Sequence, residues 1–343
     1  MKCAVFTEPF KFEIQERKMP EPKQGEVLVA IKAVGICGSD IHPYMGDGIE
    51  RRQPGIIMGH EASGVVSSVG KGVTCWKPGD RVIINPQIRC GHCEMCRVGN
   101  YNLCENMLLI GSSMRKFLDG AMCECIVIGQ DQLYRLPDNV SFDYGTLLDP
   151  LGNAIHLINR AGVKLGDTVV IIGAGTIGLL AVQTARLAGA SNVIVLDVAE
   201  GKLKLAKEVG ADFVLDSRAP DIVTQIKALT NEQGADVVVE AVGIGITYNL
   251  AMQLVKKLGT VIALGFAQDN INFSLKPLVY NEINFLGSTG YATECQTTID
   301  YLASGKLEID KIITHTFPLE QINEAFQTLC DKQATAVKVI LHP

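Results

Sequence analysis

The chain between residues 168 and 265 alternates short apolar runs with segments of helical periodicity. Nearly continuous apolar strands separated by amphipathic helices are typical of a parallel sheet covered on both faces. We therefore predict a doubly wound α/β domain over residues 151–287. The expected strands are TVVII, NVIVLD, FVLD, ADVVVE and TVIALG, and the expected helices are TIGLLAVQTARLAG, EGKLKLAKEVG, PDIVTQIKALTNEQG and NLAMQLVKKLG, the last at residues 249–259.

The first 150 residues follow a different pattern. Short β-branched runs such as EVLVAIKAVGI and EASGVVSSVG are separated by turn signals such as KPGD and LPDN. After residue 288 the alternation weakens, and the chain closes on the strand-like AVKVILHP. We expect a β-rich domain over 1–150, the doubly wound domain, and a segment over 288–343 that returns to the first domain.

Composition and charge narrow the class of protein. A chain of 343 residues is long enough for two domains. A net charge of −6 gives no electrostatic footprint for nucleic acid or an anionic membrane surface. The N-terminus lacks the apolar core of a signal peptide, and the longest apolar stretch is interrupted by glycines. We expect a cytoplasmic protein that binds neither nucleic acid nor membranes.

A glycine motif, GAGTIG, follows the first predicted strand and opens a helix. Its glycines allow a tight turn and let backbone N–H groups approach a pyrophosphate. Asp197 ends the next strand, where a carboxylate can take both ribose hydroxyls of NAD and repel a 2′-phosphate. Val198 and Ala199 supply no arginine for such a phosphate, so we expect NAD rather than NADP; the alternative is a structural turn without a ligand. The predicted motif contacts are Gly173, Gly175, Thr176, Ile177 and Gly178.

Four of the eleven cysteines fall within residues 90–104. An odd number of cysteines without a secretion signal argues for thiols rather than disulfides. The spacing C-x2-C-x2-C-x7-C suits a tetrahedral zinc closed on all four sides, although an iron–sulfur cluster can also use four cysteines. A closed site has no coordination position for a substrate, so we expect it to be structural. Its ligands are Cys90, Cys93, Cys96 and Cys104.

A second constellation is dispersed along the chain. ICGSDIH contains Cys37, and MGHE supplies His60 and Glu61. Taken singly, a Cys or a His is usually structural. Together with a carboxylate they make a three-ligand zinc site with an open fourth position, which can polarise an alcohol oxygen and lower its pKa.

These motifs resemble the zinc-containing medium-chain alcohol/polyol dehydrogenases over essentially the full chain. The resemblance is carried by CGSDIH, GHE, the four cysteines, LDPLGNAIH at 148–156, GAGTIG and the terminal KVIL. It implies an α/β protein with a GroES-like catalytic domain, a structural-zinc lobe at about 88–106 and a Rossmann cofactor domain. It also implies two Zn²⁺ per chain and a homo-oligomer, either a tetramer or a dimer.

The resemblance assigns roles around the catalytic zinc. Cys37 and His60 would be ligands, and either Glu61 or Asp149 would complete the set, directly or through water. Ser39 would pass on the substrate proton, and Asp40 would orient His60. His42 would continue the proton relay, or it is simply an exposed loop histidine. Weaker cofactor contacts, each open to being ordinary loop chemistry, are Val242, Gly243, Leu264, Gly265, Ser288 and Thr289.

The expected reaction is the NAD-dependent oxidation of a secondary alcohol to a ketone. Loops 42–58 and 111–119 hold many polar residues, which favours a polyol, a sugar alcohol or a sugar acid as the small-molecule substrate. L-Threonine and butane-2,3-diol are rival substrates. A zinc-free quinone reductase-like protein and a non-catalytic NAD-binding protein are the other classes considered. The polar residues are Tyr44, Glu50, Arg51, Arg52, Ser112, Ser113, Arg115 and Lys116.

Overall fold

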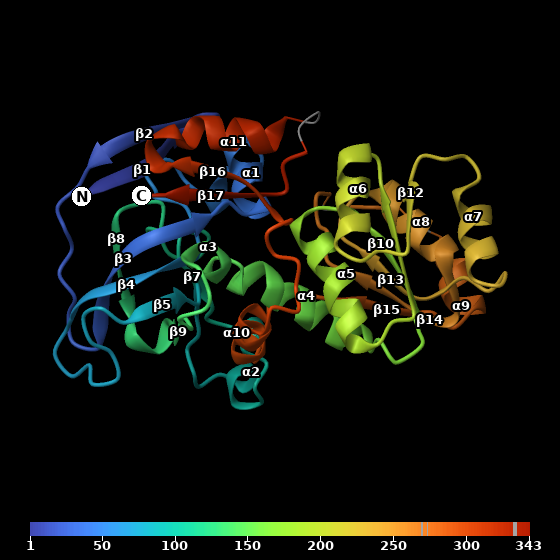
Figure 1. Cartoon of the computed structure of the whole chain (residues 1–343), viewed down its shortest axis with the longest axis horizontal. Coiled ribbons are helices and arrows are strands. Elements are labelled where there is room, and N and C mark those ends of the chain that lie inside the picture. The colour runs from blue at the N-terminus through green and yellow to red at the C-terminus, as the bar shows by residue number, and fades with distance from the viewer. Residues whose placement is uncertain (269, 273, 332–334) are drawn as a thin grey trace. The chain divides into compact units, whose positions relative to one another are not determined.

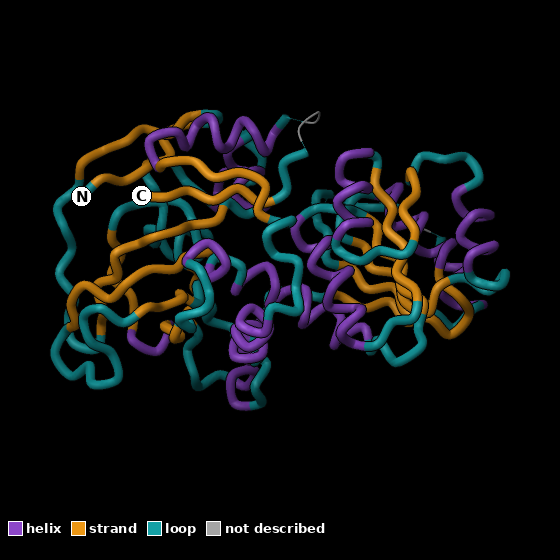
Figure 2. The backbone as a smooth tube through the Cα atoms, viewed as in Figure 1, coloured by secondary structure: helices purple, strands orange, loops and turns teal. Residues whose placement is uncertain are grey.

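A computed structural model describes residues 1–268, 270–272, 274–331 and 335–343. The chain folds into two compact units: Met1–Asp149 together with Ala292–Pro343, and the inserted Pro150–Tyr291. Strands dominate the first unit, whereas helices and strands alternate through the second (Figure 2). Among the described residues, no helix is long and apolar enough to cross a membrane.

The first unit is built around a seven-stranded sheet with the order β16-β17-β3-β4-β5-β9, in which β8 also pairs with β3. β17 runs antiparallel to β3, so the C-terminal strand lies beside one from the N-terminal segment (Figure 1). Apolar side chains from both segments share one core. The strands are β3 (Glu26–Gly35), β4 (Glu61–Val69), β5 (Arg81–Ile84), β8 (Cys125–Gly129), β9 (Leu133–Arg135), β16 (Ile313–Pro318) and β17 (Lys338–His342).

Smaller elements surround this sheet. Two hairpin-like pairs, β1 with β2 and β6 with β7, are antiparallel. Their bounds are β1 (Lys2–Glu8), β2 (Lys11–Glu16), β6 (Gln87–Ile88) and β7 (Leu108–Leu109). The helices are α1 (Gly38–Tyr44), α2 (Glu94–Arg97), α3 (Phe142–Gly145), α10 (Cys295–Ser304) and α11 (Ile322–Cys330), with 3-10 turns η1 (Ile49–Arg51), η2 (Tyr101–Leu103), η3 (Gln130–Gln132) and η4 (Leu319–Gln321).

Three aromatic rings anchor α1 in the core of the first unit. The Tyr44 ring lies 4.8 Å from that of Phe326 on α11, and the Phe12 ring lies 4.6 Å from Phe326. Tyr44 is fully buried. Because aromatic pairs contribute packing beyond their buried area, this cluster fixes the helix that carries the CGSDIH motif.

The second unit is a six-stranded parallel sheet with the order β12-β11-β10-β13-β14-β15. Helices cover both faces, α5 and α6 on one and α7, α8 and α9 on the other (Figure 1). Strand order reverses between β10 and β13, and open α/β sheets bind ligands at such a switch point, beyond the carboxyl ends of the strands. The strands are β10 (Thr168–Ile172), β11 (Asn192–Asp197), β12 (Phe213–Asp216), β13 (Ala235–Glu240), β14 (Val255–Ala263) and β15 (Asn284–Gly287).

Four helices of this unit, α5 to α8, were predicted, α4 and α9 were not, and α8 ends earlier than predicted. α8 spans Gly245–Leu254, whereas the sequence predicted a helix through residue 259. Val255 instead pairs with Ala235 at the start of β14, and Leu258 has a left-handed backbone with φ 62°. A left-handed residue cannot continue a right-handed helix, so the prediction was wrong there. The other helices are α4 (Leu148–Ala161, which begins in the first unit), α5 (Thr176–Ala188), α6 (Glu200–Glu208), α7 (Ile222–Leu229) and α9 (Leu275–Tyr280).

Two candidate metal centres and a candidate dinucleotide site

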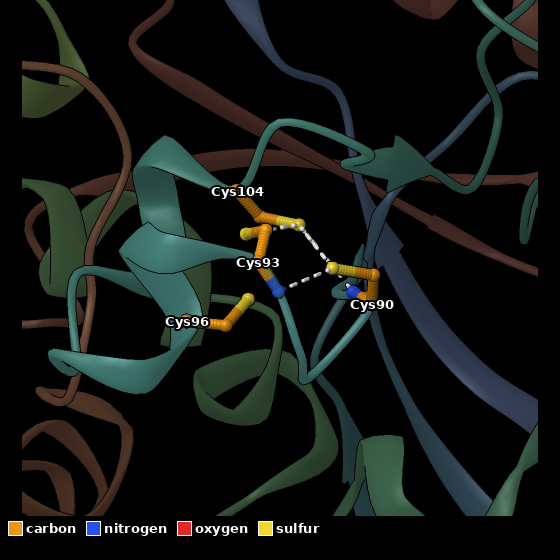
Figure 3. Close-up of side chains that lie close together, drawn as sticks. All are labelled: Cys90, Cys93, Cys96 and Cys104. Carbon is orange, nitrogen blue, oxygen red and sulfur yellow. Dashed lines mark hydrogen bonds between the residues drawn. The ribbon is translucent and has the colours of Figure 1, made fainter.

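The four clustered cysteines converge in the lobe around α2. Their sulfur atoms all lie within 4.8 Å of one another and face a common space (Figure 3). Cys104 Sγ lies 3.6 Å from Cys90 Sγ and 3.9 Å from Cys93 Sγ. Sulfur atoms at tetrahedral corners about 2.3 Å from a zinc would be about 3.8 Å apart, so the donor set fits a closed zinc site.

Without a cation the four thiols cannot all ionise together. Backbone N–H groups of His92 and Cys93 lower the pKa of Cys90 to about 5. Burial and the neighbouring sulfurs raise the pKa of Cys96 to about 12. A divalent cation relieves this conflict, because it stabilises every thiolate at once.

A second group joins Cys37, His60 and Glu61, whose ligand atoms lie within 4.8 Å of one another. The sheet register explains how residues so far apart in sequence meet. β3 and β4 are antiparallel neighbours with Gly35 opposite Glu61. Cys37 therefore follows the end of one strand, while His60 and Glu61 stand at the beginning of the next. Sulfur, imidazole and carboxylate are the donors of a three-ligand zinc site, so these residues fit the metal.

Local sequence fixes both halves of this group. Cys37 precedes α1, where its backbone N–H donates to Asp40 Oδ2 at 3.3 Å in a capping box. Gly59, directly before His60, has φ 95° and packs against two other glycines. A Cβ added to Gly120 would lie 2.2 Å from the Gly59 carbonyl oxygen, and one added to Gly111 would lie 2.8 Å from it. Larger residues would displace the backbone that presents the imidazole.

His60 is buried among anionic groups. Its Nδ1 lies 3.6 Å from Asp40 Oδ1, and among the described residues no group hydrogen-bonds to this nitrogen. Burial alone would lower the pKa of His60, but the charges of Asp40, Cys37 and Asp149 outweigh it and raise the pKa to about 10. The pocket therefore favours a positive charge at this point, which a bound cation would also provide.

Asp40 has a second partner that the sequence did not reveal. The Arg52 Nε donates to Asp40 Oδ1 at 3.1 Å, and both side chains are buried. Arg52 also donates to the Arg51 carbonyl at 3.0 Å. The same carboxylate oxygen thus lies between Arg52 and His60. The sequence predicts Arg52 in a polar substrate pocket, but its guanidinium is instead committed to this interior ion pair.

Glu61 likewise has a buried cationic partner. The Lys338 ammonium of β17 pairs with Glu61 Oε2 and donates to the Ile36 carbonyl at 3.1 Å. Both side chains are 1% exposed. A Cβ on Gly35 would lie 2.4 Å from Glu61 Oε2, so glycine is needed here to leave room for the pair. Lys338 opens the terminal KVIL motif, but nothing in the sequence placed its ammonium beside Glu61.

The other predicted residues of this site lie around the three-residue group. Asp149, in the first turn of α4, is outside the group, yet its charge contributes to the raised pKa of His60. Ser39 and His42 are both on α1 and partly exposed. His42 lies within α1 rather than on a loop, and its Nδ1 lies 3.5 Å from Asp47 Oδ2.

The polar loops expected to line a substrate pocket are partly used within the protein. Tyr44 is a buried core residue, contrary to that expectation. The Ser113 hydroxyl donates to the Glu50 carbonyl at 2.9 Å, and the Gln53 N–H donates to the same hydroxyl at 2.8 Å. These bonds join the two loops. Arg115 donates to the Glu105 carbonyl beside the cysteine lobe. Glu50, Arg115 and Lys116 are exposed.

The glycine motif lies at the carboxyl end of β10 in the second unit. Gly173 has φ 105°, and a Cβ on Gly178 would lie 1.9 Å from the Gly173 carbonyl oxygen. The Asp197 carboxylate accepts the Ala174 N–H at 2.7 Å. The end of β11 is therefore tied to the glycine turn. The motif leaves the backbone at the helix start free of side chains, as dinucleotide binding requires. Thr176 and Ile177 begin α5.

Two further predicted turns interlock beside this motif. A Cβ on Gly265 would lie 2.2 Å from the Gly243 N, so the turns after β13 and β14 touch backbone to backbone. The buried Glu240 carboxylate accepts the N–H groups of Val242 at 3.1 Å and Gly243 at 2.9 Å. Sequence reasoning missed Glu240, although a carboxylate ending an apolar strand was a visible signal. Leu264 donates its N–H to the Glu240 carbonyl at 3.0 Å.

Ser288 and Thr289 follow the end of β15. The Ser288 N–H donates to the Ala263 carbonyl at 2.9 Å. Its hydroxyl is buried, and nothing in the described part of the chain hydrogen-bonds to it. Buried hydroxyls are normally paired, so this one fits a role in ligand binding.

Comparison with known proteins supports a single family. The alcohol dehydrogenase GroES-like domain matches residues 23–138, and the zinc-binding dehydrogenase model matches residues 176–304. Sorbitol dehydrogenase of Bacillus subtilis is 33% identical over 100% of this chain and 97% of its own length. D-xylulose reductase A of Aspergillus oryzae is 31% identical over 96% of this chain and 93% of its own.

Similar solved structures support the same family. A Sinorhizobium meliloti protein solved with bound NADP superposes with a TM-score of 0.91 at 32% identity, covering 100% of this chain and 99% of that one. An Escherichia coli CFT073 alcohol dehydrogenase complexed with NADH has a TM-score of 0.92 at 29% identity, with the same coverage. The likeness therefore includes both units and extends to proteins that bind nicotinamide dinucleotides.

Proposed function

This chain belongs to the zinc-binding, medium-chain alcohol dehydrogenase family, and on that premise we propose that it oxidises a secondary hydroxyl of a polyol, sugar alcohol or sugar acid to the ketone, with NAD as the hydride acceptor. It is an NAD(P)-dependent enzyme of this family. The first unit would be the catalytic domain and the second the cofactor domain. The observation that carries the proposal is the convergence of Cys37, His60 and Glu61, whose ligand atoms lie within 4.8 Å of one another; a separate set of four cysteines converges in the same way.

The three-ligand group would hold the catalytic zinc. Four-coordinate zinc with three protein ligands keeps one position for the substrate oxygen. Zinc bound there would supply Lewis-acid polarisation of that oxygen. Glu61 belongs to the converging group and Asp149 does not, so we assign Glu61 as the direct ligand and place Asp149 at the site through a water.

Residues of α1 would handle the substrate proton. The Ser39 hydroxyl would accept it, and the partly exposed His42 would deliver it to solvent. Asp40 would hold the His60 ring through Nδ1, which fixes the ring's orientation toward the metal. The four-cysteine lobe would hold a second, structural zinc, giving two per chain.

We infer the substrate class from the relatives of this chain. The similar proteins named above are a sorbitol dehydrogenase and a D-xylulose reductase. We extend that polyol class to this chain and keep L-threonine and butane-2,3-diol as rivals in the test. We also propose that the protein is cytoplasmic and forms a homo-oligomer, either a tetramer or a dimer. Light scattering would measure the mass of the oligomer.

Activity and metal content together test the proposal. Polyols, sugar acids, threonine and 2,3-diols would be screened by NADH absorbance, with zinc measured on the same samples. We expect turnover of a polyol-class substrate and two zinc atoms per chain. Cys37→Ser should lose one zinc and all turnover, whereas Cys75→Ser, at an exposed cysteine outside both groups, should lose neither. Full turnover by Cys37→Ser would contradict the assignment.

A further inference from the structure

Two aspartates stand side by side at the carboxyl edge of the parallel sheet. β11 and β12 are neighbouring parallel strands, and Asp197 is in register with Asp216. Each residue ends its strand. Ligands of open α/β sheets bind beyond this edge, so both carboxylates lie where the adenosine end of a dinucleotide would be recognised.

The Asp197 carboxylate is held by backbone groups. Its Oδ2 accepts the Ala174 N–H at 2.7 Å, and its Oδ1 accepts the N–H groups of Val198 at 2.8 Å and Ala199 at 2.9 Å. Three donors keep this carboxylate in one orientation. It therefore remains a fixed negative charge beside the ribose position.

An arginine from the next loop reaches the same turn. The Arg218 Nη2 donates to the Val198 carbonyl at 3.1 Å, directly after Asp197. The sequence around Asp197 suggested no arginine near the ribose, but the fold supplies one from the end of β12. A guanidinium in this position is the group that would be expected to bind a 2′-phosphate, because its planar fork matches phosphate oxygens.

The guanidinium of Arg218 is already paired with the Asp216 carboxylate. Its Nε donates to Asp216 Oδ1 at 2.9 Å, and its Nη2 donates to Asp216 Oδ2 at 2.7 Å. The Arg218 backbone N–H donates to the same Oδ1 at 2.9 Å. These bonds lower the pKa of Asp216 to about 2, so its carboxylate is ionised at neutral pH.

We propose that Asp216 determines cofactor specificity by holding Arg218 in a bidentate pair, which keeps the guanidinium from a 2′-phosphate. NAD preference then has two sources: Asp197 repels the phosphate, and Asp216 withholds the cation that would bind it. This inference rests on the proposed function, because it concerns the cofactor of that reaction. Asp216 acts through Arg218 and touches neither the reacting atoms nor the substrate.

A double-mutant cycle on nucleotide binding tests the inference. Dissociation constants for NADH and NADPH would be measured by fluorescence for the unaltered enzyme, Asp216→Asn, Arg218→Met and the double variant. We expect Asp216→Asn to lower the dissociation constant for NADPH about tenfold, which corresponds to the gain of one charge-assisted contact. The dissociation constant for NADH should change less than about twofold. Arg218→Met should show no gain, and the double variant should lose the gain.

The outcomes separate the two proposals. An equal gain in Asp216→Asn and in the double variant would mean simple charge repulsion, and it would overturn the role of Arg218. No gain in Asp216→Asn, with NADH still bound, would overturn this inference while leaving the proposed function intact. Failure of the unaltered enzyme to bind either nucleotide would contradict the proposed function and this inference with it. Both substituted side chains are substantially exposed, and thermal unfolding would verify that each variant folds.

Discussion

Lys338 and Glu61 form an ion pair in the interior of the first unit, between the C-terminal strand and a candidate metal ligand. The two residues come from the two separate segments that form the first unit and meet because β17 and β4 both flank β3. Glycine at position 35 leaves the space that the carboxylate occupies. The pair gives Glu61 a compensating charge whether or not a metal is bound.

Removing the Lys338 ammonium should lower the free energy of unfolding. Lys338→Met leaves the Glu61 carboxylate buried without its cation, which typically costs about 3–5 kcal/mol. Urea unfolding of chelator-treated protein, in which no zinc offsets the Glu61 charge, would measure the change in the free energy of unfolding. The double variant Lys338→Met/Glu61→Gln should recover part of the loss, because it removes the unpaired charge. A loss below about 1 kcal/mol in Lys338→Met would contradict the importance of this pair.

Loss of a lobe cysteine should affect stability rather than chemistry. Cys104→Ser removes one of the four converging sulfur ligands, so the lobe should lose its zinc. We expect the protein to be destabilised by about 4 kcal/mol, the linkage contribution of a metal at a thousand times its dissociation constant. Calorimetry with zinc analysis would measure this. Cys75→Ser is the matched control, and an unchanged unfolding temperature in Cys104→Ser would show that the lobe holds no structural metal.

Stability of metal-free protein should depend on pH through His60. The pKa of this histidine is raised to about 10 in the folded state, against an ordinary value of 6.5. A raised pKa means that the folded state binds the extra proton more tightly. The contribution is therefore fully present below about pH 6.5 and is lost as the pH rises toward 10. Chelator-treated protein should lose stability across this window relative to His60→Gln; parallel curves for the two proteins would refute the prediction.

Asp197 should control both the affinity for NADH and the discrimination against NADPH. Asp197→Ala removes the acceptor of the Ala174 N–H and the carboxylate offered to the ribose, so NADH binding should weaken about tenfold. Discrimination against NADPH should relax, because a fixed negative charge is lost. Ratios of the two dissociation constants would measure the effect. Asp212→Ala, which alters an aspartate away from the glycine turn, serves as a control, and an unchanged ratio in Asp197→Ala would refute the ribose role.

Local patterns were sufficient for several elements of this protein. The apolar runs predicted β10 to β14 of the second unit, although not β15, because a strand buried on both faces must be apolar throughout. GAGTIG and the four-cysteine lobe were visible because their residues act within one short segment. The end of α8 was not predictable in this way. Val255 and Leu258 continue a helix-like pattern, but pairing with Ala235 in the sheet overrides it.

The sequence by itself determined the family resemblance and the alternation of a β-rich and a doubly wound region, and it predicted which residues would bind metal or dinucleotide. Only the tertiary structure decided which buried charges meet, Arg52 at Asp40 and Lys338 at Glu61, and that Arg218 reaches the turn after Asp197. The reason is physical. Spacing along the chain encodes local geometry, whereas a buried charge is tolerated only where folding brings a distant partner to it, and no local pattern records that partner.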